Sequence, residues 1–248
     1  MVTAVAPEAA AVLRGVARAV PGSAPVEVSL PGGFRLHRCG PVDVLAAGVG
    51  PVAAAAGTAT ALATALAVAP LPYVLAVSAG IAGGFAPAAP LGCAVVADAV
   101  VAADLGAQTP DGFASVTELG FGRVRHETEH AEPVARALRA AGLPTALGPV
   151  LTVSTVTGSA ERAAELATGH PGAVAEAMEG FGVAEAAAGH RVPVLELRGV
   201  SNAVGPRDRA AWRIADAFAT LESIFAALPY PTVLSPAPLP RDLGGTTP

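Results

Sequence analysis

Residues 194–212 read VLELRGVSNAVGPRDRAAW and change in character twice. The apolar first part predicts a buried strand over residues 193–200, and the polar residues Arg198, Ser201 and Asn202 stand at its carboxyl end. The segment after them restarts with helical spacing. In a sheet of parallel strands, ligands bind in the crevice beyond the carboxyl ends. This stretch therefore predicts a sheet covered by helices and, at the strand end, a ligand site.

The rest of the chain repeats this alternation of short β-branched runs with Ala-rich helical runs. We predict strands at residues 2–6, 42–47, 73–79, 94–101, 149–155 and 193–200, and a hairpin of 26–30 with 34–38 around the tripeptide PGG. We predict helices at residues 8–20, 51–68, 132–141, 159–168, 179–189 and 208–227. The order predicts one α/β domain whose central mixed, largely parallel β-sheet is flanked by helices.

The last predicted helix has one apolar face and an acidic start. Asp208 or a neighbour is the expected cap, and the apolar positions are Trp212, Ile214, Ala215, Phe218, Leu221, Ile224 and Phe225. Residues 229–248 follow with five prolines in their first twelve positions and no periodicity. We therefore predict a domain over residues 1–228 and an extended or disordered Pro-rich tail over 229–248.

Composition excludes several classes of partner. A net charge of −5 over 248 residues argues against nucleic-acid binding, which needs clustered basic side chains. The apolar stretch 52–69 draws its hydrophobicity from Ala and Thr and lacks basic and aromatic flanks, so we predict a buried helix and no membrane partner. Cys39 and Cys93 have no metal-type spacing and predict buried, reduced thiols. With no basic leader before the first apolar run, we predict a cytoplasmic protein.

The pentapeptide HETEH at residues 126–130 matches the zinc pattern H-E-x-x-H. That pattern requires a helix through both histidines, whereas Pro133 suits the first turn of a helix that starts near Ala131. His126 and His130 are then expected in a solvated polar loop. We predict no metal site.

The segment GVGPVA at residues 48–53 imitates the dinucleotide fingerprint G-x-G-x-x-G/A, since it follows a predicted strand and opens a helix. The acidic residue that should contact a ribose about 20 residues later is missing. We therefore predict no dinucleotide cofactor. A tight strand-to-helix turn beside a ligand and plain turn chemistry both remain open for this segment.

Glycine-rich or polar strand ends occur at residues 46–51, 78–84 and 198–202, and Met178-Glu179-Gly180 opens a further helix. The pairing of Met-Glu-Gly with RGVSN resembles the purine nucleoside phosphorylase and nucleosidase superfamily. Within it, the motifs GVGPVAAAAGT, SAGIAGGF, ADLGAQTPDGF, TELGFG, LTVSTVTG, EAMEGFGVA and RGVSNAVGPRDRAAW are similar to the futalosine hydrolase family. The resemblance covers about residues 2–225 and implies a nucleoside phosphorylase/hydrolase-like fold.

This resemblance implies hydrolysis of the N-glycosidic bond of futalosine to hypoxanthine and dehypoxanthine futalosine, in the futalosine pathway of menaquinone biosynthesis. A ribosyl cation-like transition state needs groups that hold the ribose, stabilise the departing purine and polarise a water. The resemblance places the ribose-binding carboxylate at Glu179, with Met178 against the sugar. Relatives that act on adenine nucleosides usually have aspartate where this chain has Asn202. Hypoxanthine presents acceptors at N7 and O6, so an amide donor there suits a 6-oxopurine.

The water-orienting group is predicted to be Glu8. Superfamily nucleosidases typically carry a second acid two residues later, where this chain has Ala10. A first-turn helix acid is the alternative role for Glu8.

Further substrate-binding residues are expected around these groups. Gly83, Arg198 and Ser201 stand at the same strand ends, so we expect them to contact the substrate as well. The benzoate group of futalosine calls for a cation. The candidates are Arg207 and Arg209, or Arg123 and Arg125, and each is equally consistent with a surface position. Phe121 and Phe181 are candidates to cover the base or the side chain, with an apolar filler role as the alternative.

Two other activities remain open at the level of sequence. One is a related enzyme of the superfamily, either a methylthioadenosine/S-adenosylhomocysteine nucleosidase or a 6-oxopurine nucleoside phosphorylase. The other is a non-catalytic nucleoside-binding protein, which the departure at Ala10 makes conceivable. In each case we expect a small nucleoside ligand, no cofactor, and a homo-oligomer, the last by resemblance only.

Overall fold

The computed structural model describes residues 1–68 and 73–235 of the chain. The strands are β1 (Val2–Thr3), β2 (Val26–Ser29), β3 (Arg35–Cys39), β4 (Val42–Ala46), β5 (Ala76–Gly84), β6 (Ala94–Ala102), β7 (Gly106–Thr109), β8 (Gly112–Ser115), β9 (Arg125–Glu127), β10 (Thr145–Thr152), β11 (Ala175–Ala177) and β12 (Val194–Ala203). The helices are α1 (Ala6–Ala19), α2 (Pro51–Val68), α3 (Ala131–Ala140), α4 (Ala160–Gly169), α5 (Gly180–Gly189), α6 (Ile214–Ala227) and α7 (Tyr230–Val233), with 3₁₀ turns at Pro31–Gly33 and Arg209–Ala211.

Within these residues the main sheet has ten strands, and most run in the order β11-β10-β6-β12-β5-β1-β4-β3-β2, with β9 paired to β6. Its pairings are both parallel and antiparallel, so the predicted mixed α/β sheet is confirmed. Strand β11 pairs with β10 on one side and also with β5. Strands β5, β12, β6, β10 and β11 therefore close into a ring, in which β5 lies between β11 and β12.

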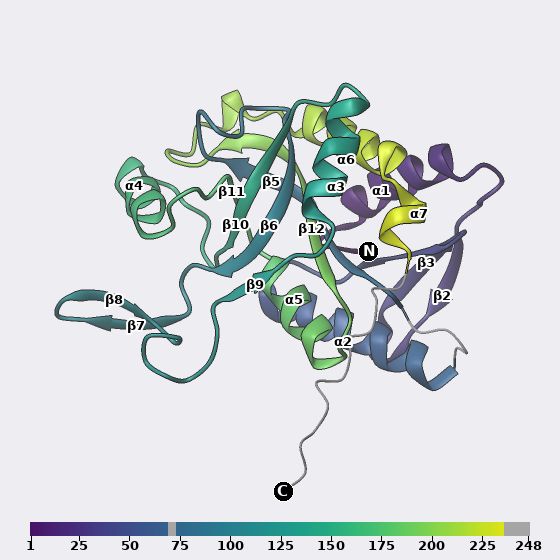
Figure 1. Ribbon diagram of the computed structural model, residues 1–248, viewed down its shortest axis with the longest axis horizontal. Coiled ribbons are helices and arrows are strands. Elements are labelled where there is room, and N and C mark those ends of the chain that lie inside the picture. Colours follow the sequence, from purple (N-terminus) through teal and green to yellow (C-terminus); the bar gives the residue numbers. More distant parts are fainter. Residues whose placement is uncertain (69–72, 236–248) are drawn as a thin grey trace, which may run out of the picture.

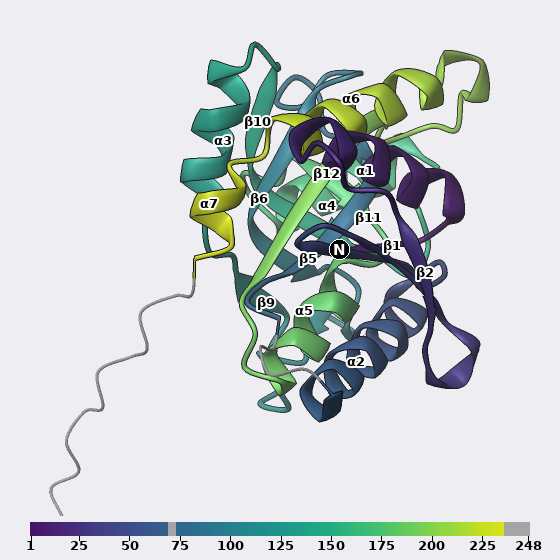
Figure 2. The same cartoon turned by 90° about the vertical axis from the view of Figure 1, so that its right-hand side faces the viewer.

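Helices cover both faces of the sheet, as Figures 1 and 2 show. Helices α1 and α6 lie together on one side, and α2 and α5 lie together on the other (Figure 2). The β7–β8 hairpin projects from the body of the molecule (Figure 1). It forms a small two-stranded sheet of its own.

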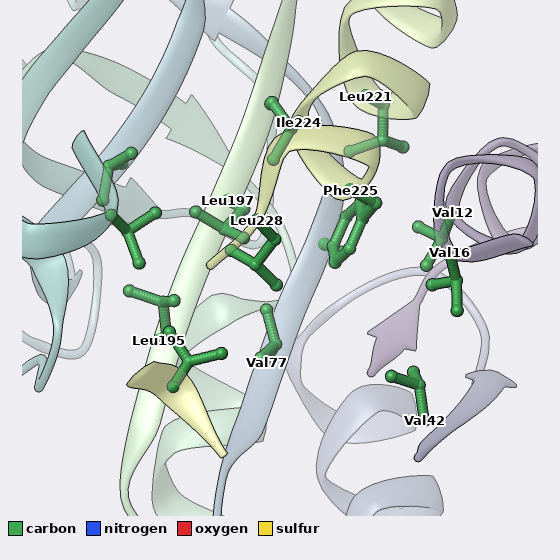
Figure 3. Packing of buried hydrophobic residues seen from close by; sticks show 14 of the residues in the cluster. Val12, Val16, Val42, Val77, Leu195, Leu197, Leu221, Ile224, Phe225 and Leu228 are labelled. Atoms are coloured by element: carbon green, nitrogen blue, oxygen red, sulfur yellow. The ribbon is translucent and has the colours of Figure 1, made fainter. Parts of the chain in front are cut away.

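The larger core cluster lies between the sheet and the pair α1 and α6. Leu195 and Leu197 of β12, Leu221 and Phe225 of α6 and Val12 of α1 belong to this one cluster of buried side chains (Figure 3). All five side chains are fully buried. Burial of one such side chain contributes about 1.5–3 kcal/mol, so this contact holds the strand that carries the candidate site residues.

Most predicted elements occur within a few residues of their expected bounds, and the differences have local causes. The first strand stops at Thr3 because the chain turns into α1 at Ala6. The strand predicted at 73–79 begins at Ala76 and continues through the glycines to Gly84. The predicted helix 208–227 is split: Asp208 accepts a hydrogen bond from the Ala210 amide and caps a 3₁₀ turn, and α6 starts only at Ile214.

Two predicted loops are wrong. The expected polar loop at HETEH contains strand β9, in which His126 is buried. The expected tail contains helix α7 over Tyr230–Val233, whose residues Tyr230 and Val233 are buried in the main core. The Tyr230 hydroxyl donates to the Phe225 carbonyl at 2.9 Å. The prediction of an extended segment therefore fails from residue 230 to 233, and residues 236–248 lie outside the described part of the chain.

Helix α2 packs against α5 and against the sheet, with Ala54, Thr58 and Leu62 buried. In the part of the chain that the structure describes, none of the helices combines the length and the apolar character that crossing a bilayer requires. Cys39 and Cys93 are free and buried, in agreement with the prediction.

Candidate active site

A cavity of about 200 Å³ lies where several strand ends and helix starts converge. Its walls include seven of the predicted residues: Glu8, Gly83, Met178, Glu179, Ser201, Asn202 and Arg207. These residues come from segments separated by up to about 200 positions in the chain. The fold therefore gathers most of the candidate residues around one site, as expected for the carboxyl edge of an α/β sheet.

Glu179 is buried at the start of α5 and is held on two sides. Its Oε1 accepts a hydrogen bond from the Gly50 amide at 3.1 Å, and its Oε2 lies 3.3 Å from Arg198 Nη1. Gly50 has a φ of 92°, a left-handed conformation that favours glycine. The GVGPVA segment thus forms the predicted strand-to-helix turn, and one of its amides orients the carboxylate.

Arg198 is a fully buried cation beneath this carboxylate. Its Nε donates to Glu196 Oε1 at 2.8 Å and its Nη2 donates to Ser78 Oγ at 2.9 Å. Burial alone would lower the pKa of Arg198, but the carboxylates of Glu196, Glu179 and Glu8 raise it above its ordinary value. Arg198 therefore stays charged and fixes the position of Glu179 from below.

Glu196 is the least expected member of this cluster, because it is completely buried and was not predicted. Its Oε2 has no hydrogen-bond partner among the described residues. Burial raises the pKa of Glu196 above its usual range, against the opposing effect of Arg198. A buried carboxylate of this kind persists only beside a compensating cation, which Arg198 supplies.

Glu8 connects the first helix to the centre of the sheet. Its Oε2 accepts hydrogen bonds from the amides of Ala4 at 2.9 Å and Val5 at 3.2 Å, and its Oε1 accepts one from the Ile81 amide at 2.9 Å. Glu8 therefore caps α1 and also lines the cavity. Ala10, where the superfamily pattern has a second acid, is exposed on α1.

Asn202 projects from a bulge near the end of β12, where the pairing with β5 shifts between Val200 and Asn202. Its Oδ1 accepts a hydrogen bond from Ser201 Oγ at 2.8 Å, and its Nδ2 donates to the Ala203 carbonyl at 3.0 Å. The Ser201 hydroxyl also lies 3.2 Å from the Ala82 carbonyl, so two acceptors share its one hydrogen. The bond to Ala203 uses one of the two amide hydrogens, so a second donor remains for a ligand.

Arg207 and Arg209 both lie over the ring of Trp212, at 5.5 Å and 6.0 Å from its centroid. Of these three residues, Arg207 and Trp212 line the cavity and Arg209 does not. Arg207 is exposed at the edge of the cavity. The prediction that Trp212 belongs to the apolar face of the last helix is wrong, because α6 begins two residues later. Sequence reasoning missed this aromatic wall because it extended the helix through the 3₁₀ turn.

Two predicted aromatic residues lie away from the cavity. Phe121 is 81% exposed on the loop after the β7–β8 hairpin. Phe181 is buried in α5, where its ring centroid lies 5.4 Å from that of His126 and its amide donates to Thr152 Oγ1. Phe181 therefore fills apolar space in the core, which is the alternative role given for it above.

The histidines of HETEH do not share a site. His126 Nε2 lies 2.7 Å from Glu185 Oε1 on α5, and His130 stands before α3 with a φ of 65°. No helix runs through the motif, because α3 begins at Ala131. Over residues 1–68 and 73–235, no three His, Cys, Asp or Glu side chains cluster as metal ligands would.

Residues 3–228 match the family described as the phosphorylase superfamily. The chain is 63% identical over 209 residues to a futalosine hydrolase of Streptomyces coelicolor, covering 83% of this chain and 86% of that protein. It is 46% identical over 230 residues to a futalosine hydrolase of Acidothermus cellulolyticus, covering 92% and 88%. The chain belongs to the futalosine hydrolase family. The family predicted from the motifs is thereby confirmed.

Two solved structures have the same fold as this member of the futalosine hydrolase family. The structure of futalosine hydrolase of Helicobacter pylori superposes with a TM-score of 0.73 at 20% identity, covering 91% of this chain and 94% of that chain. A methylthioadenosine/S-adenosylhomocysteine nucleosidase of Neisseria meningitidis superposes with a TM-score of 0.71 at 19% identity, covering 91% and 96%. At these identities the likeness shows the fold alone.

Sequence reasoning also missed Glu176 and Thr157, which line the same cavity. Glu176 belongs to β11, a strand of three residues that was not predicted. Its carboxylate accepts hydrogen bonds from the Thr157 amide at 2.8 Å and from the Thr157 hydroxyl. The available signal was an acid two positions before Met178 in an otherwise apolar run.

Proposed function

We propose that this protein hydrolyses the N-glycosidic bond of futalosine and releases hypoxanthine and dehypoxanthine futalosine, a step of the futalosine pathway of menaquinone biosynthesis. The observation that carries the proposal is the convergence of Glu179 and Asn202 on one cavity in a chain 63% identical to a futalosine hydrolase. Glu8 lines the same cavity. The three groups supply the three functions that a ribosyl cation-like transition state requires.

Glu179 accepts hydrogen bonds from the ribose 2′- and 3′-hydroxyls in this proposal. The amide of Gly50 and the guanidinium of Arg198 already occupy one lone pair on each oxygen and hold the carboxylate in place. A carboxylate has about four acceptor sites, so two remain for the sugar. Met178, half-buried beside Glu179, packs against the sugar ring.

Asn202 stabilises the departing base with its remaining Nδ2 hydrogen, which the N7 and O6 acceptors of hypoxanthine share. Ser201 supports this role because its hydroxyl donates to Oδ1 and leaves Nδ2 as the group that binds the base. An aspartate at this position would face O6 with an acceptor. The unmade bond would cost about 1–3 kcal/mol.

Glu8 orients the attacking water in this proposal. Its carboxylate is fixed by three backbone amides from two elements, so it is already positioned when the substrate binds. Gly80 allows this arrangement, because an added Cβ there would lie 2.6 Å from Arg198 Nη1. Arg198 holds Glu179 by an ion pair at 3.3 Å as the positive charge develops on the sugar.

The carboxylate on the extended 5′ side of futalosine is assigned to Arg207. This guanidinium lies at the edge of the cavity and stacks on Trp212, which also lines it. An arginine above an aromatic ring offers a cation next to an apolar surface, which suits an aromatic acid. Cytoplasmic location and assembly into a homo-oligomer stay predictions from the sequence and the resemblance.

The test is release of hypoxanthine from futalosine by the purified protein in phosphate-free buffer containing a chelator. Stoichiometric release of free hypoxanthine and dehypoxanthine futalosine supports the proposal. Release only after phosphate is added would instead indicate a phosphorylase. Turnover of methylthioadenosine in preference to futalosine would indicate an adenine nucleosidase. Tight futalosine binding in a calorimeter without turnover would indicate a non-catalytic binding protein.

A further inference from the structure

Glu176 is a second buried carboxylate of the cavity, and the mechanism above gives it no role. This residue is 6% exposed and lies in β11, three residues before the ribose-binding Glu179. It lines the same cavity as Asn202. A buried carboxylate costs free energy unless donors satisfy it, so its placement at a ligand site calls for an explanation.

The register of the sheet relates Glu176 to Asn202 through a single glycine. Gly83 of β5 pairs with Asn202 of β12 on one side and with Glu176 of β11 on the other. Neighbouring strands lie about 4.8 Å apart, so the Cα atoms of Glu176 and Asn202 are roughly 10 Å apart across Gly83. Residues in register project to the same face of a sheet, and both side chains line the cavity.

Gly83 has no side chain and therefore leaves space between the side chains of Glu176 and Asn202. A Cβ added to Gly83 would lie 3.2 Å from Asn202 Nδ2 and 3.1 Å from Val204 Cγ2, closer than side chains normally approach. With glycine there, a flat ring can lie over the backbone between an amide on one strand and a carboxylate on the other. This arrangement fits a purine base with one edge toward each strand.

The hydrogen-bonding groups of the two side chains are complementary to a 6-oxopurine. The remaining Asn202 amide hydrogen is a donor, which matches the N7 and O6 acceptors. An ionised Glu176 is an acceptor only, which matches the N1–H donor that a 6-oxopurine carries. Adenine carries a lone pair at N1 and would face the carboxylate with an acceptor.

We propose that Glu176 accepts a hydrogen bond from N1–H of the hypoxanthine ring and, together with Asn202 across Gly83, selects 6-oxopurines over 6-aminopurines. This inference rests on the proposed function and adds the group that reads the second edge of the base. The two Thr157 donors occupy one lone pair on each Glu176 oxygen and set the orientation of the carboxylate, so a further lone pair on each oxygen is left for the base.

The experiment compares kcat/KM for futalosine with kcat/KM for its 6-amino analogue in Glu176→Gln. We expect the ratio of futalosine to analogue to fall at least about 10-fold, because the neutral amide weakens the bond to N1–H and removes the repulsion of the adenine N1 lone pair. Glu165→Gln is the matched control, since it makes the same change at an exposed carboxylate of α4 that does not line the cavity. Its ratio should stay within about 3-fold of wild type.

A purely structural role for Glu176 predicts a different result. Glu176→Gln would then lower turnover of the two substrates in parallel, and an unchanged ratio in this variant would overturn the proposal. Wild-type protein offers a second measurement if that variant does not fold. Competitive inhibition by hypoxanthine should be at least about 10-fold stronger than inhibition by 1-methylhypoxanthine, which lacks the N1–H donor. Equal inhibition would also overturn the proposal.

These outcomes are separable from the fate of the proposed function. Failure of wild-type protein to release hypoxanthine from futalosine would contradict the proposed reaction. Binding of free hypoxanthine and 1-methylhypoxanthine, measured by calorimetry, would still test the contact with Glu176. Normal hydrolysis of futalosine with an unchanged base preference in Glu176→Gln would contradict only the role of Glu176.

Discussion

Individual side chains at the site are oriented by contacts that depend on the local geometry of the strand. Asn202 is the clearest example. Its position after a buried strand suggested a ligand contact, and in the structure the hydroxyl of the adjacent Ser201 donates to its Oδ1 at 2.8 Å. Ser201 reaches Oδ1 because it occupies the bulge between Val200 and Asn202. Base recognition at this residue therefore depends on a local irregularity of the strand.

Asn202→Asp replaces this amide with a carboxylate of similar size. We expect kcat/KM for futalosine to fall about 5- to 150-fold, because a carboxylate has no donor for N7 and O6 unless it is protonated. Turnover of the 6-amino analogue should fall less or rise, since an aspartate accepts from a 6-amino group. Steady-state kinetics on the two substrates measure the change, and an unchanged preference would contradict the proposed contact.

Seven of the residues proposed from the sequence line the cavity, and six of them lie in the quoted motifs: Gly83, Met178, Glu179, Ser201, Asn202 and Arg207. Residues that it missed carry at most a weak local signal, such as the single acid at Glu176 in an apolar run. Glu196 looks like an ordinary strand position, and only the fold shows that it is buried beside Arg198. Phe121 had a suggestive glycine-rich setting, yet its ring is exposed. Side-chain direction at loops depends on tertiary contacts, so spacing along the chain could not decide these cases.

Helices α2 and α5 illustrate how elements position the site. The amide of Gly50, just before α2, binds Glu179 at the start of α5, so the two helix starts must lie close together. Gly182 makes this contact feasible, because an added Cβ would collide with the backbone carbonyl of Pro51. The packing of the two helices is therefore coupled directly to the orientation of the ribose-binding carboxylate.

Gly182→Ala is expected to destabilise the protein by about 1–3 kcal/mol, since the new methyl group forces α5 away from α2. It should also lower kcat/KM for futalosine by weakening the Gly50 contact with Glu179. Gly189→Ala, in the same helix with no atom within 4 Å of the added Cβ, is the matched control and should be neutral or slightly stabilising. Chemical denaturation of the two variants measures the difference; equal stability would contradict the packing argument.

Elements were predictable where the pattern is long and periodic. Helix α2 spans 51–68 as predicted, because Pro51 marks its first turn and its apolar residues continue for five turns of helix. Strands β9 and β11 were missed, since each has only three residues and pairs with strands distant in sequence. Such short segments become strands only when a neighbouring edge supplies their hydrogen bonds.

At the scale of the whole molecule, the domain extends beyond the boundary that composition suggested. The run of prolines after Leu228 predicted a tail, but Tyr230 and Val233 are buried in the same core as Phe225. Pro231 lies in the first turn of α7, where the missing N–H costs nothing. Proline content alone therefore did not distinguish a helix start from an extended segment.

Val233→Ala should lower the free energy of unfolding by about 2 kcal/mol, because two methyl-sized groups leave a fully buried position and a cavity remains. Thr232→Ala, at an exposed position of the same helix, is the control and should change stability by less than about 0.5 kcal/mol. Thermal unfolding of both variants measures the effect. A Val233→Ala protein as stable as its control would place α7 outside the cooperative core.

The sequence by itself determined the alternation of strands and helices, the family, and the segments that carry Glu179 and Asn202, because periodicity and short motifs are local properties of the chain. Only the tertiary structure decided that β5, β12, β6, β10 and β11 close into a ring, which sets Glu176 and Asn202 on either side of Gly83. It also decided that Arg198 is buried among carboxylates. The physical reason is that strand pairing and burial join segments far apart in the chain, and no local pattern records which segments those are.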